Sequence, residues 1–324
     1  MKKLSRRSIL LATFSTLTGT PGATQDLSTK PIRLVSGFPP GGGVDAVARI
    51  VAQGLSQQLS QPVIIDIRPG AGGAIALAEL QKATPDGYTF GYGNVGQLAI
   101  LEHISKQQKV DVFKSIVGVG YVAHAPMALF VPASLGVNSL VDYLNLLKNN
   151  PDKFSYGSGG NGQIGHLAFE MLKSKTNLKI QHIPYKGLGP ALTDLIAGRL
   201  VGVMDVLGAG MPHVKSGRLQ VLALAVSERV SDFSNIPTFK ELGVADYVVS
   251  GWQGMVAPVN TPLLLLQRMN QALSQVLSTK DIQERLIALG YYPQIMTSTQ
   301  FSQFMQNESA RWGALCRELK IEVE

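Results

Sequence analysis

The sequence has one cysteine and few charged residues. A single cysteine, Cys316, excludes an internal disulfide framework and a cysteine-based zinc site in a chain of 324 residues. Only 16% of the residues are charged, and Lys and Arg are scattered, so we expect no nucleic-acid partner. The formal net charge of +7 falls to +3 without residues 1–23, which contain four basic and no acidic residues.

The common catalytic and cofactor motifs are also missing. The five histidines form no HExxH pattern, and only His166 shares a helical face with an acid, Glu170, so no metal site is predicted. Ser158 has no G-x-S-x-G context and no evident base partner. Residues 157–162 match a dinucleotide fingerprint, but the next predicted strand contains no acid for a ribose hydroxyl. We expect neither catalysis nor a cofactor; an exported α/β enzyme acting on a carboxylic acid is the alternative.

Residues 1–23 have the layout of a secretory signal. A basic start precedes an apolar run from Ile9 to Leu17, and small residues end at Ala23. The run is too short and too rich in Thr and Ser to span a bilayer. Ser5-Arg6-Arg7 fits a twin-arginine signal as well as an ordinary basic region, so both export routes stay open. We expect an exported protein of the periplasm with its signal peptide removed.

Glycine is abundant, with 34 residues, many of them in clusters. Residues 32–36 are rich in β-formers, residues 38–43 are mostly Pro and Gly, and apolar residues recur at helical spacing over 44–60. A glycine-rich loop before a helix N-terminus leaves backbone N–H groups free for an anion. We predict that this anion is a carboxylate on a small solute. Asp45 either stabilises the helix start or orients the loop.

The strand–loop–helix order recurs along the chain. Strands are predicted at 63–67 and 88–92, each followed by a glycine-rich loop, which indicates a parallel sheet with its loops at one edge. A second series starts at strand 154–156 and loop 157–162. Two extended apolar runs suit a crossing into a second domain and a return crossing, namely Tyr121 to Val131 and Tyr247 to Ala257.

Eight segments together resemble the solute receptors of tripartite tricarboxylate transporters, the Bug family. They follow one another along nearly all of the chain after the signal. The RPGAGG and PDGYT pair and the HIPYKGLGPALTDL block are the most specific. The segments are PIRLVSGFPPGGGVDAVAR, QPVIIDIRPGAGG, TPDGYTFGYGN, KFSYGSGGNGQIGHLAFEML, HIPYKGLGPALTDLIAGRL, MPHVKSGRLQVLALAVSERV, IPTFKELGV and GWQGMVAPVNTP.

The resemblance implies a fold and a function. The fold is α/β, a two-lobed periplasmic binding protein (type II-like) in which each lobe is a mostly parallel sheet flanked by helices, with two hinge crossings. We place lobe 1 at residues 27–124 plus 248–324 and lobe 2 at 125–247. The function is capture of a carboxylate-bearing solute in the manner of a Venus flytrap, followed by delivery to the membrane subunits of a transporter. We expect a monomer; a periplasmic sensor for a membrane kinase is an alternative.

The resemblance also assigns a binding site to the first loop of each lobe. Asp205 matches an acid of the family and either meets an amino or hydroxyl group of the solute or is a hydrogen-bonded structural acid. His166 either braces its loop or lies at the mouth of the site. The predicted ligand-binding residues are Phe38, Pro40, Gly41, Gly42, Gly43, Asp45, Gly93, Asn94, Ser158, Gly159, Gly160, Asn161, Gly162, His166, Tyr185 and Asp205.

The sequence departs from the family pattern in three places. Val44 stands where the family often has Ser or Thr, and residues 206–209 lack the polar side chains that often follow the acid. The segment 103–112 lacks the usual Leu-Pro-Tyr-Asp-like pattern. These departures favour a solute that is less polar beyond its carboxylate than a citrate-like one.

Overall fold

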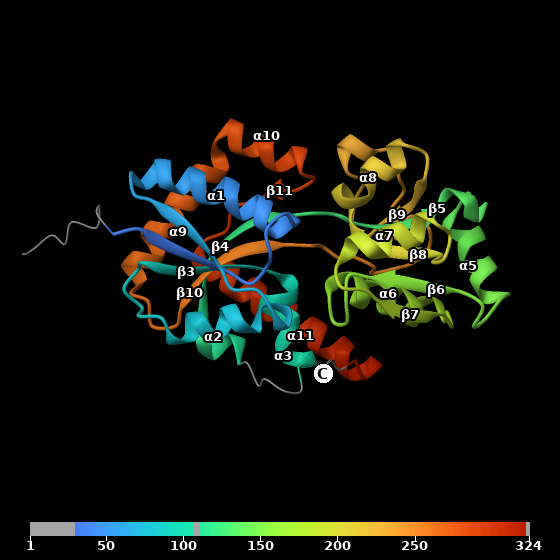
Figure 1. Ribbon diagram of the computed structural model, residues 1–324, viewed down its shortest axis with the longest axis horizontal. Coiled ribbons are helices and arrows are strands. Elements are labelled where there is room, and N and C mark those ends of the chain that lie inside the picture. The colour runs from blue at the N-terminus through green and yellow to red at the C-terminus, as the bar shows by residue number, and fades with distance from the viewer. Residues whose placement is uncertain (1–29, 106–110, 322–324) are drawn as a thin grey trace, which may run out of the picture.

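The computed structural model describes residues 30–105 and 111–321. They form two bodies side by side along the long axis of the molecule, joined by strands that pass between them (Figure 1). The expected signal peptide, residues 1–23, lies outside the described residues. Within the described ranges, no helix has both the length and the apolar run needed to cross a membrane.

The first lobe contains a six-stranded sheet in the order β11-β4-β10-β3-β1-β2. Helices α1, α9 and α10 pack on one face, and α2, α3 and α11 cover the other (Figure 1). The strands are β1 Ile32–Ser36, β2 Val63–Ile67, β3 Thr89–Asn94, β4 Ile116–His124, β10 Gln253–Pro258 and β11 Tyr292–Pro293. The helices are α1 Gly43–Leu59, α2 Ala74–Lys82, α3 Leu101–Ile104, α4 Val112–Ser115, α9 Leu263–Ser278, α10 Lys280–Ala288 and α11 Ser298–Leu319.

The second lobe contains a five-stranded sheet in the order β7-β6-β8-β5-β9. Helices α5 and α6 contribute to one apolar cluster, and α7 and α8 to another on the opposite face. The strands are β5 Met127–Pro132, β6 Ser155–Ser158, β7 Gln181–Pro184, β8 Gly202–Val206 and β9 Leu219–Leu224. The helices are α5 Leu140–Lys148, α6 Ile164–Thr176, α7 Leu188–Ile196 and α8 Leu207–Lys215.

The two-lobed α/β architecture is as predicted, but the sheets are mixed rather than mostly parallel. Strand β1 pairs parallel with β2 and β3, whereas β10 pairs antiparallel with both β3 and β4. In the second lobe, β6 pairs parallel with β7 and β8, and β5 runs antiparallel to β8 and β9. The reason is that β5 and β10 enter from the other lobe. They begin at the boundary where the parallel strands end, so they run in the opposite direction.

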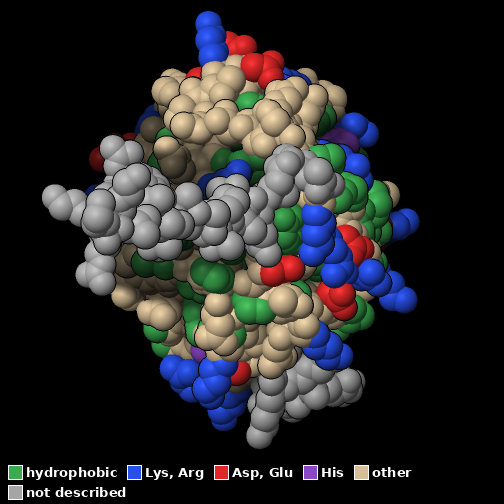
Figure 2. All heavy atoms as spheres, turned by 90° about the vertical axis from the view of Figure 1, so that its left-hand side faces the viewer, with side chains coloured by type: hydrophobic (Ala, Val, Ile, Leu, Met, Phe, Trp, Pro, Cys, Tyr) green, Lys and Arg blue, Asp and Glu red, His purple; other side chains and the backbone are tan. Residues whose placement is uncertain are grey.

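The two crossings lie next to each other at the boundary between the lobes. The apolar run predicted at 121–131 forms two strands, β4 and β5, separated at Ala125-Pro126. Ala125 and Gly251 exchange backbone hydrogen bonds of 3.2 and 3.0 Å, so the outgoing and returning segments are paired there. On the end of the first lobe that faces away from the second, basic side chains lie among acidic and apolar ones (Figure 2).

Candidate functional site

The loop after β1 delivers the N-terminus of α1 to the carboxyl end of the first sheet. Gly41 has φ +89, a backbone conformation that favours glycine, and Gly42 caps α1 without a side-chain hydrogen bond. Val47 and Val51 on α1 are fully buried, which holds the helix against the sheet. The first N–H groups of a helix have no intrahelical carbonyl partner, so this helix end can receive an anion.

Asp45 braces this loop. Its Oδ2 accepts hydrogen bonds of 3.0 Å from the Gly41 backbone N–H and from Arg49 Nε. The Arg49 guanidinium lowers the pKa of the Asp45 carboxyl, so this side chain is charged at neutral pH. Asp45 does not cap the helix as its N-cap residue, because that position belongs to Gly42. Both roles considered for Asp45 fit the geometry, because it is an acid in the first turn of α1 and also holds the Gly41 N–H of the loop.

The loops after β1, β2 and β3 meet around one buried side chain, that of Gln97. Its Nε2 donates a 3.1 Å hydrogen bond to the Gly73 carbonyl, and a Cβ on Gly37 would lie 2.8 Å from the Gly73 Cα. A Cβ on Gly93 would lie 2.6 Å from Gln97 Oε1, and Asn94 Oδ1 accepts from the Gln97 backbone N–H. The predicted residues Gly93 and Asn94 therefore shape this edge of the sheet. No pattern in the sequence predicted a role for Gln97 at the site, because this residue lies in an otherwise apolar segment.

The corresponding loop of the second lobe is organised by Ser158. Its Oγ receives a hydrogen bond from the Gly160 backbone N–H and lies 2.7 Å from His182 Nε2. The structure thus corrects the expectation that Ser158 has no base partner, because β7 carries His182 alongside β6. Ser158 is fully buried, and its Oγ also donates to the Gly160 carbonyl at 3.1 Å. Its role here is to hold the loop.

His166 and His182 form a buried stack behind the loop. Their ring centroids are 4.0 Å apart, and the Gly162 backbone N–H donates to His166 Nδ1 at 3.1 Å. Burial, with His166 and Lys173 nearby, lowers the pKa of His182 to about 3. Burial also lowers the pKa of His166, so both rings are neutral at physiological pH. A neutral His166 can accept from Gly162, which favours its loop-bracing role.

The other predicted residues of this lobe have different surroundings. Gly160 and Gly162 have φ of +145 and +71, so both positions favour glycine. The Gly159 carbonyl accepts a 2.9 Å hydrogen bond from the Gly187 N–H, and Asn161 is exposed. The Tyr185 hydroxyl donates to Asp194 Oδ2 at 2.6 Å, so this hydroxyl is directed to α7.

Tyr291 lies beside the first turn of α1, and Asp205 lies beside the first turn of α6. Asp205 Oδ2 is 3.8 Å from the Cβ position of Gly165, in the first turn of α6, and Asp205 Oδ1 accepts from the Val206 N–H at 2.7 Å. The Tyr291 hydroxyl is 2.6 Å from the Cβ position of Gly43, in the first turn of α1. Burial raises the pKa of Asp205 to about 6, and burial with the nearby Asp205 raises that of Tyr291 to about 12. Sequence reasoning missed Tyr291, which follows a helix and belongs to no motif.

The lobes also touch through backbone. A Cβ on Gly208, in α8, would lie 2.7 Å from the Leu289 carbonyl oxygen, and a Cβ on Gly290 would lie 3.1 Å from the Gly208 Cα. Nearby, Tyr292 Oη lies 3.5 Å from Asp232 Oδ2. In the described ranges, no three His, Cys, Asp or Glu side chains are grouped so that they could hold a metal ion.

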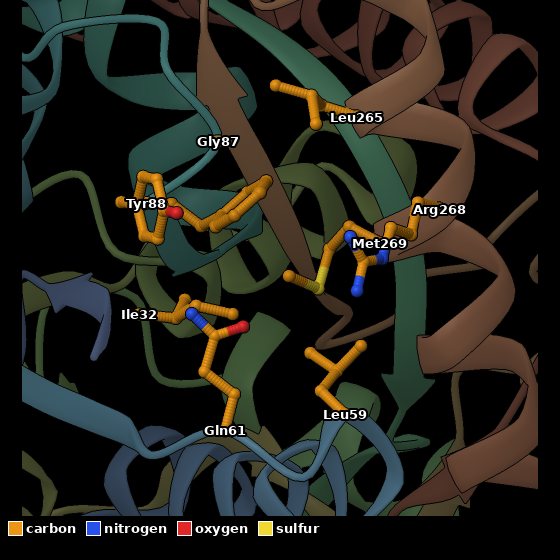
Figure 3. A pocket seen from close by; sticks show the side chains of 9 residues that line it. Ile32, Leu59, Gln61, Gly87, Tyr88, Leu265, Arg268 and Met269 are labelled. Carbon is orange, nitrogen blue, oxygen red and sulfur yellow. The ribbon is translucent and has the colours of Figure 1, made fainter. Parts of the chain in front are cut away.

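A small pocket lies at the other end of the first sheet (Figure 3). Its volume is about 30 Å³, which is room for about one water molecule. It lies near the start of β1 and of α9, far along the sheet from the glycine loops, and it is too small for an organic solute. Its labelled lining residues are Ile32, Leu59, Gln61, Gly87, Tyr88, Leu265, Arg268 and Met269.

Two α/β lobes, two paired crossings and a helix N-terminus from each lobe at the boundary define the fold of the periplasmic binding proteins. The sequence model of the tripartite tricarboxylate transporter family receptor matches residues 47–321. BugT of Bordetella pertussis is 32% identical over 315 residues, which cover 95% of this chain and 97% of BugT. The chain therefore belongs to the family of tripartite tricarboxylate transporter receptors and is a solute-binding receptor.

Solved structures of relatives have the same fold. An R. palustris protein with adipate superposes with a TM-score of 0.83 at 30% identity, covering 91% of this chain and 99% of its own. MatC from Rhodopseudomonas palustris, with bound malate, has a TM-score of 0.78 at 25% identity, covering 89% of this chain and 98% of its own. The prediction of the fold class and of the receptor family is thereby confirmed.

Proposed function

We propose that this receptor captures a small carboxylate-bearing solute between its lobes, in the periplasm, and delivers it to the membrane subunits of a tripartite tricarboxylate-type transporter. The observation that carries the proposal is that a polar side chain lies beside the first turn of each helix, Tyr291 at α1 and Asp205 at α6. Helix N-termini favour anions through their free N–H groups and their dipoles. The adipate and malate held by relatives are dicarboxylates, which suits one carboxylate at each helix.

The predicted site residues divide into binding groups and braces. The N–H groups of Gly41, Gly160 and Gly162 are bonded to the side chains of Asp45, Ser158 and His166. They shape the loops and are not free to bind the solute. The solute carboxylates are then held by the first-turn amides of α1 and α6, which begin at Gly43 and Ile164. The proposed environment includes the other predicted residues, Phe38, Pro40, Gly42, Gly93, Asn94, Gly159, Asn161, Tyr185 and Asp205.

Asp205 adds a requirement on the rest of the solute. Asp205 is half-buried, and its Oδ1 already accepts from the Val206 N–H, so Oδ2 is the carboxylate oxygen that can take a further donor. A hydroxyl or amino group on the solute supplies that donor. Val44 beside the first loop and Val206 beside Asp205 are apolar and half-buried, which favours a solute with few other polar groups.

The proposal includes the organisation of the whole chain. Residues 1–23 are a signal peptide removed on export, by the twin-arginine or the general secretory route. Lobe 1 comprises residues 27–124 and 248–324, lobe 2 comprises 125–247, and the receptor is a monomer. It carries out no catalysis and needs no cofactor. Support for the absence of catalysis comes from Ser158, whose hydroxyl is buried and bonded to Gly160 of its own loop.

A thermal-shift screen tests this function. Purified mature protein is mixed with mono-, di- and tricarboxylates and with amino acids, and the midpoint of unfolding is measured. A solute that binds the folded state raises this midpoint by mass action. We expect at least one dicarboxylate to do so. If none of the carboxylates shifts the midpoint, the proposed function is wrong.

A further inference from the structure

Tyr291 reaches the site from a part of the chain that contains neither glycine loop. It follows α10 and Gly290, whose φ of +79 turns the chain towards the sheet edge. Only 6% of Tyr291 is exposed, so its ring is held by packing. Its hydroxyl lies against Gly43, the first residue of α1, where a methyl group would come within 2.6 Å of it.

The Gln253 side chain interacts with two tyrosine hydroxyls, those of Tyr92 and Tyr291. Tyr92 Oη donates to Gln253 Oε1 at 2.7 Å, and both residues are only 1% exposed. Because its amide oxygen faces Tyr92, the amide NH₂ of Gln253 is the group that remains for its hydrogen bond with Tyr291. The Tyr291 oxygen is then the acceptor, and its own proton points to another partner.

The available partners of this proton lie at the boundary between the lobes. The first turn of α1 presents N–H groups, which cannot accept a hydrogen bond. The Asp205 carboxylate, on the other lobe, is close enough for its charge to raise the pKa of Tyr291. The other acceptor that fits is an oxygen of an anion bound at the first turn of α1, beside Gly43.

We propose that Tyr291 is a solute-binding residue whose hydroxyl donates a hydrogen bond to the carboxylate held at the first turn of α1. Gln253 and Tyr92 position this hydroxyl. This inference rests on the proposed function, because it needs a carboxylate at that helix. It adds a side-chain donor from the C-terminal part of the chain to a site otherwise built from backbone N–H groups. Such a donor favours ligands whose carboxylate is ionised, since hydrogen bonds to charged groups are the stronger ones.

The test is the affinity of a Tyr291→Phe variant for malate, succinate, adipate and glutamate, measured by isothermal titration calorimetry. We expect the dissociation constant to rise about tenfold or more for each ligand that the wild type binds. Tyr88→Phe is the control. This tyrosine lines the small pocket at the far end of the first sheet, so the affinity of the variant should equal that of the wild type.

A second variant, Gly43→Ala, displaces the hydroxyl without removing it. The added methyl group would lie 2.6 Å from Tyr291 Oη, so the tyrosine must shift. We expect weaker binding in this variant. In the double variant with Tyr291→Phe we expect a loss no larger than that of Tyr291→Phe alone, since both changes remove one interaction.

The outcomes separate the two proposals. If the wild type binds none of the four ligands, the proposed function fails and this inference fails with it. If the wild type binds one of them and Tyr291→Phe binds it equally well, only the inference is wrong. If Tyr291→Phe does not fold, wild-type affinity of Gly43→Ala overturns the inference, because the tyrosine hydroxyl must shift in that variant.

Discussion

Two ionisable groups of this receptor, Asp205 and His182, change its stability with pH in opposite directions. Asp205 has a pKa raised to about 6 by burial, and His182 has a pKa lowered to about 3, also chiefly by burial. Each group is therefore held in its neutral form over a wider pH range than in the unfolded chain. Asp205 is ionised at pH 7, so its burial costs stability there, whereas His182 is neutral at that pH.

The substitution Asp205→Asn should stabilise the protein at pH 7. Between its unfolded pKa near 3.8 and its folded pKa near 6, Asp205 binds more protons in the folded state, so stability falls as pH rises through this range. The amide introduced by the substitution stays neutral and can still accept from the Val206 N–H. We expect a gain on the order of 1–3 kcal/mol at pH 7, measured by urea unfolding.

The gain should disappear at pH 4, where Asp205 is protonated in the folded wild type. His182 and the other titratable groups are common to both proteins, so the difference between them isolates Asp205. An equal difference in unfolding free energy at pH 7 and pH 4 would contradict this assignment.

At the scale of elements, one strand–loop–helix unit in each lobe brings backbone N–H groups to the boundary between the lobes. These units are β1 with α1 and β6 with α6. In each unit a side chain from the first turn reaches back to its own loop: Asp45 to Gly41, and His166 to Gly162. Each of these two hydrogen bonds joins residues that are four positions apart in the sequence. This shared construction explains how loops so rich in glycine keep one shape, because the flexible backbone is tied at the helix start.

The substitution Gly42→Val should abolish solute binding while the fold remains. Gly42 has φ −83, which any residue adopts, and its Cβ would meet only the Pro39 carbonyl oxygen at 4.0 Å. The side chain would then stand before the first turn of α1 and block close approach of a carboxylate. Calorimetric titration with the solute found in the screen measures the loss, and circular dichroism checks the fold. Unchanged affinity would show that the solute does not use this loop.

For the molecule as a whole, the contact between Gly208 and Gly290 sets how closely the lobes approach. The Gly208 Cα and the Leu289-Gly290 backbone meet with no room for a side chain. A receptor that encloses its solute needs this approach, because both helix N-termini must reach the ligand together. We therefore expect glycine at this position to be needed for closure of the lobes, in addition to any role within the second lobe.

The substitution Gly208→Val should hold the lobes apart. The side chain would lie 2.7 Å or less from the Leu289 carbonyl oxygen unless the lobes separate. We expect a larger radius of gyration by small-angle X-ray scattering and an affinity weakened by about tenfold or more, since the binding-competent state becomes a minor one. Gly189→Val, on α7 of the same lobe, is the control, because a Cβ there meets nothing within 4 Å. Equal scattering and affinity for both variants would refute this role of Gly208.

The sequence by itself determined the family, the two-lobed fold and the two glycine loops with their helices. The glycine loops and their helices are local features: a β-rich run, a Gly and Pro cluster and an apolar 3.6-residue period lie within about 20 to 30 residues, so their physical consequences can be derived without knowing the rest of the chain. The family and the two-lobed fold followed from the resemblance of eight segments spread along the chain. The loop-bracing roles of Asp45 and His166 were among the alternatives for the same reason, since each contact spans four residues.

Only the tertiary structure decided what depends on distant parts of the chain. The pairing of Ser158 with His182, the antiparallel entry of β5 and β10, and the chain from Tyr92 through Gln253 to Tyr291 all join segments that no local pattern connects. Tyr92 and Gln253 are 161 residues apart. Whether a polar side chain finds a partner at that separation is set by how two lobes and two crossings pack. Periodicity along the chain predicts which faces of helices and strands are buried. The packing of the folded chain determines which residues contact one another.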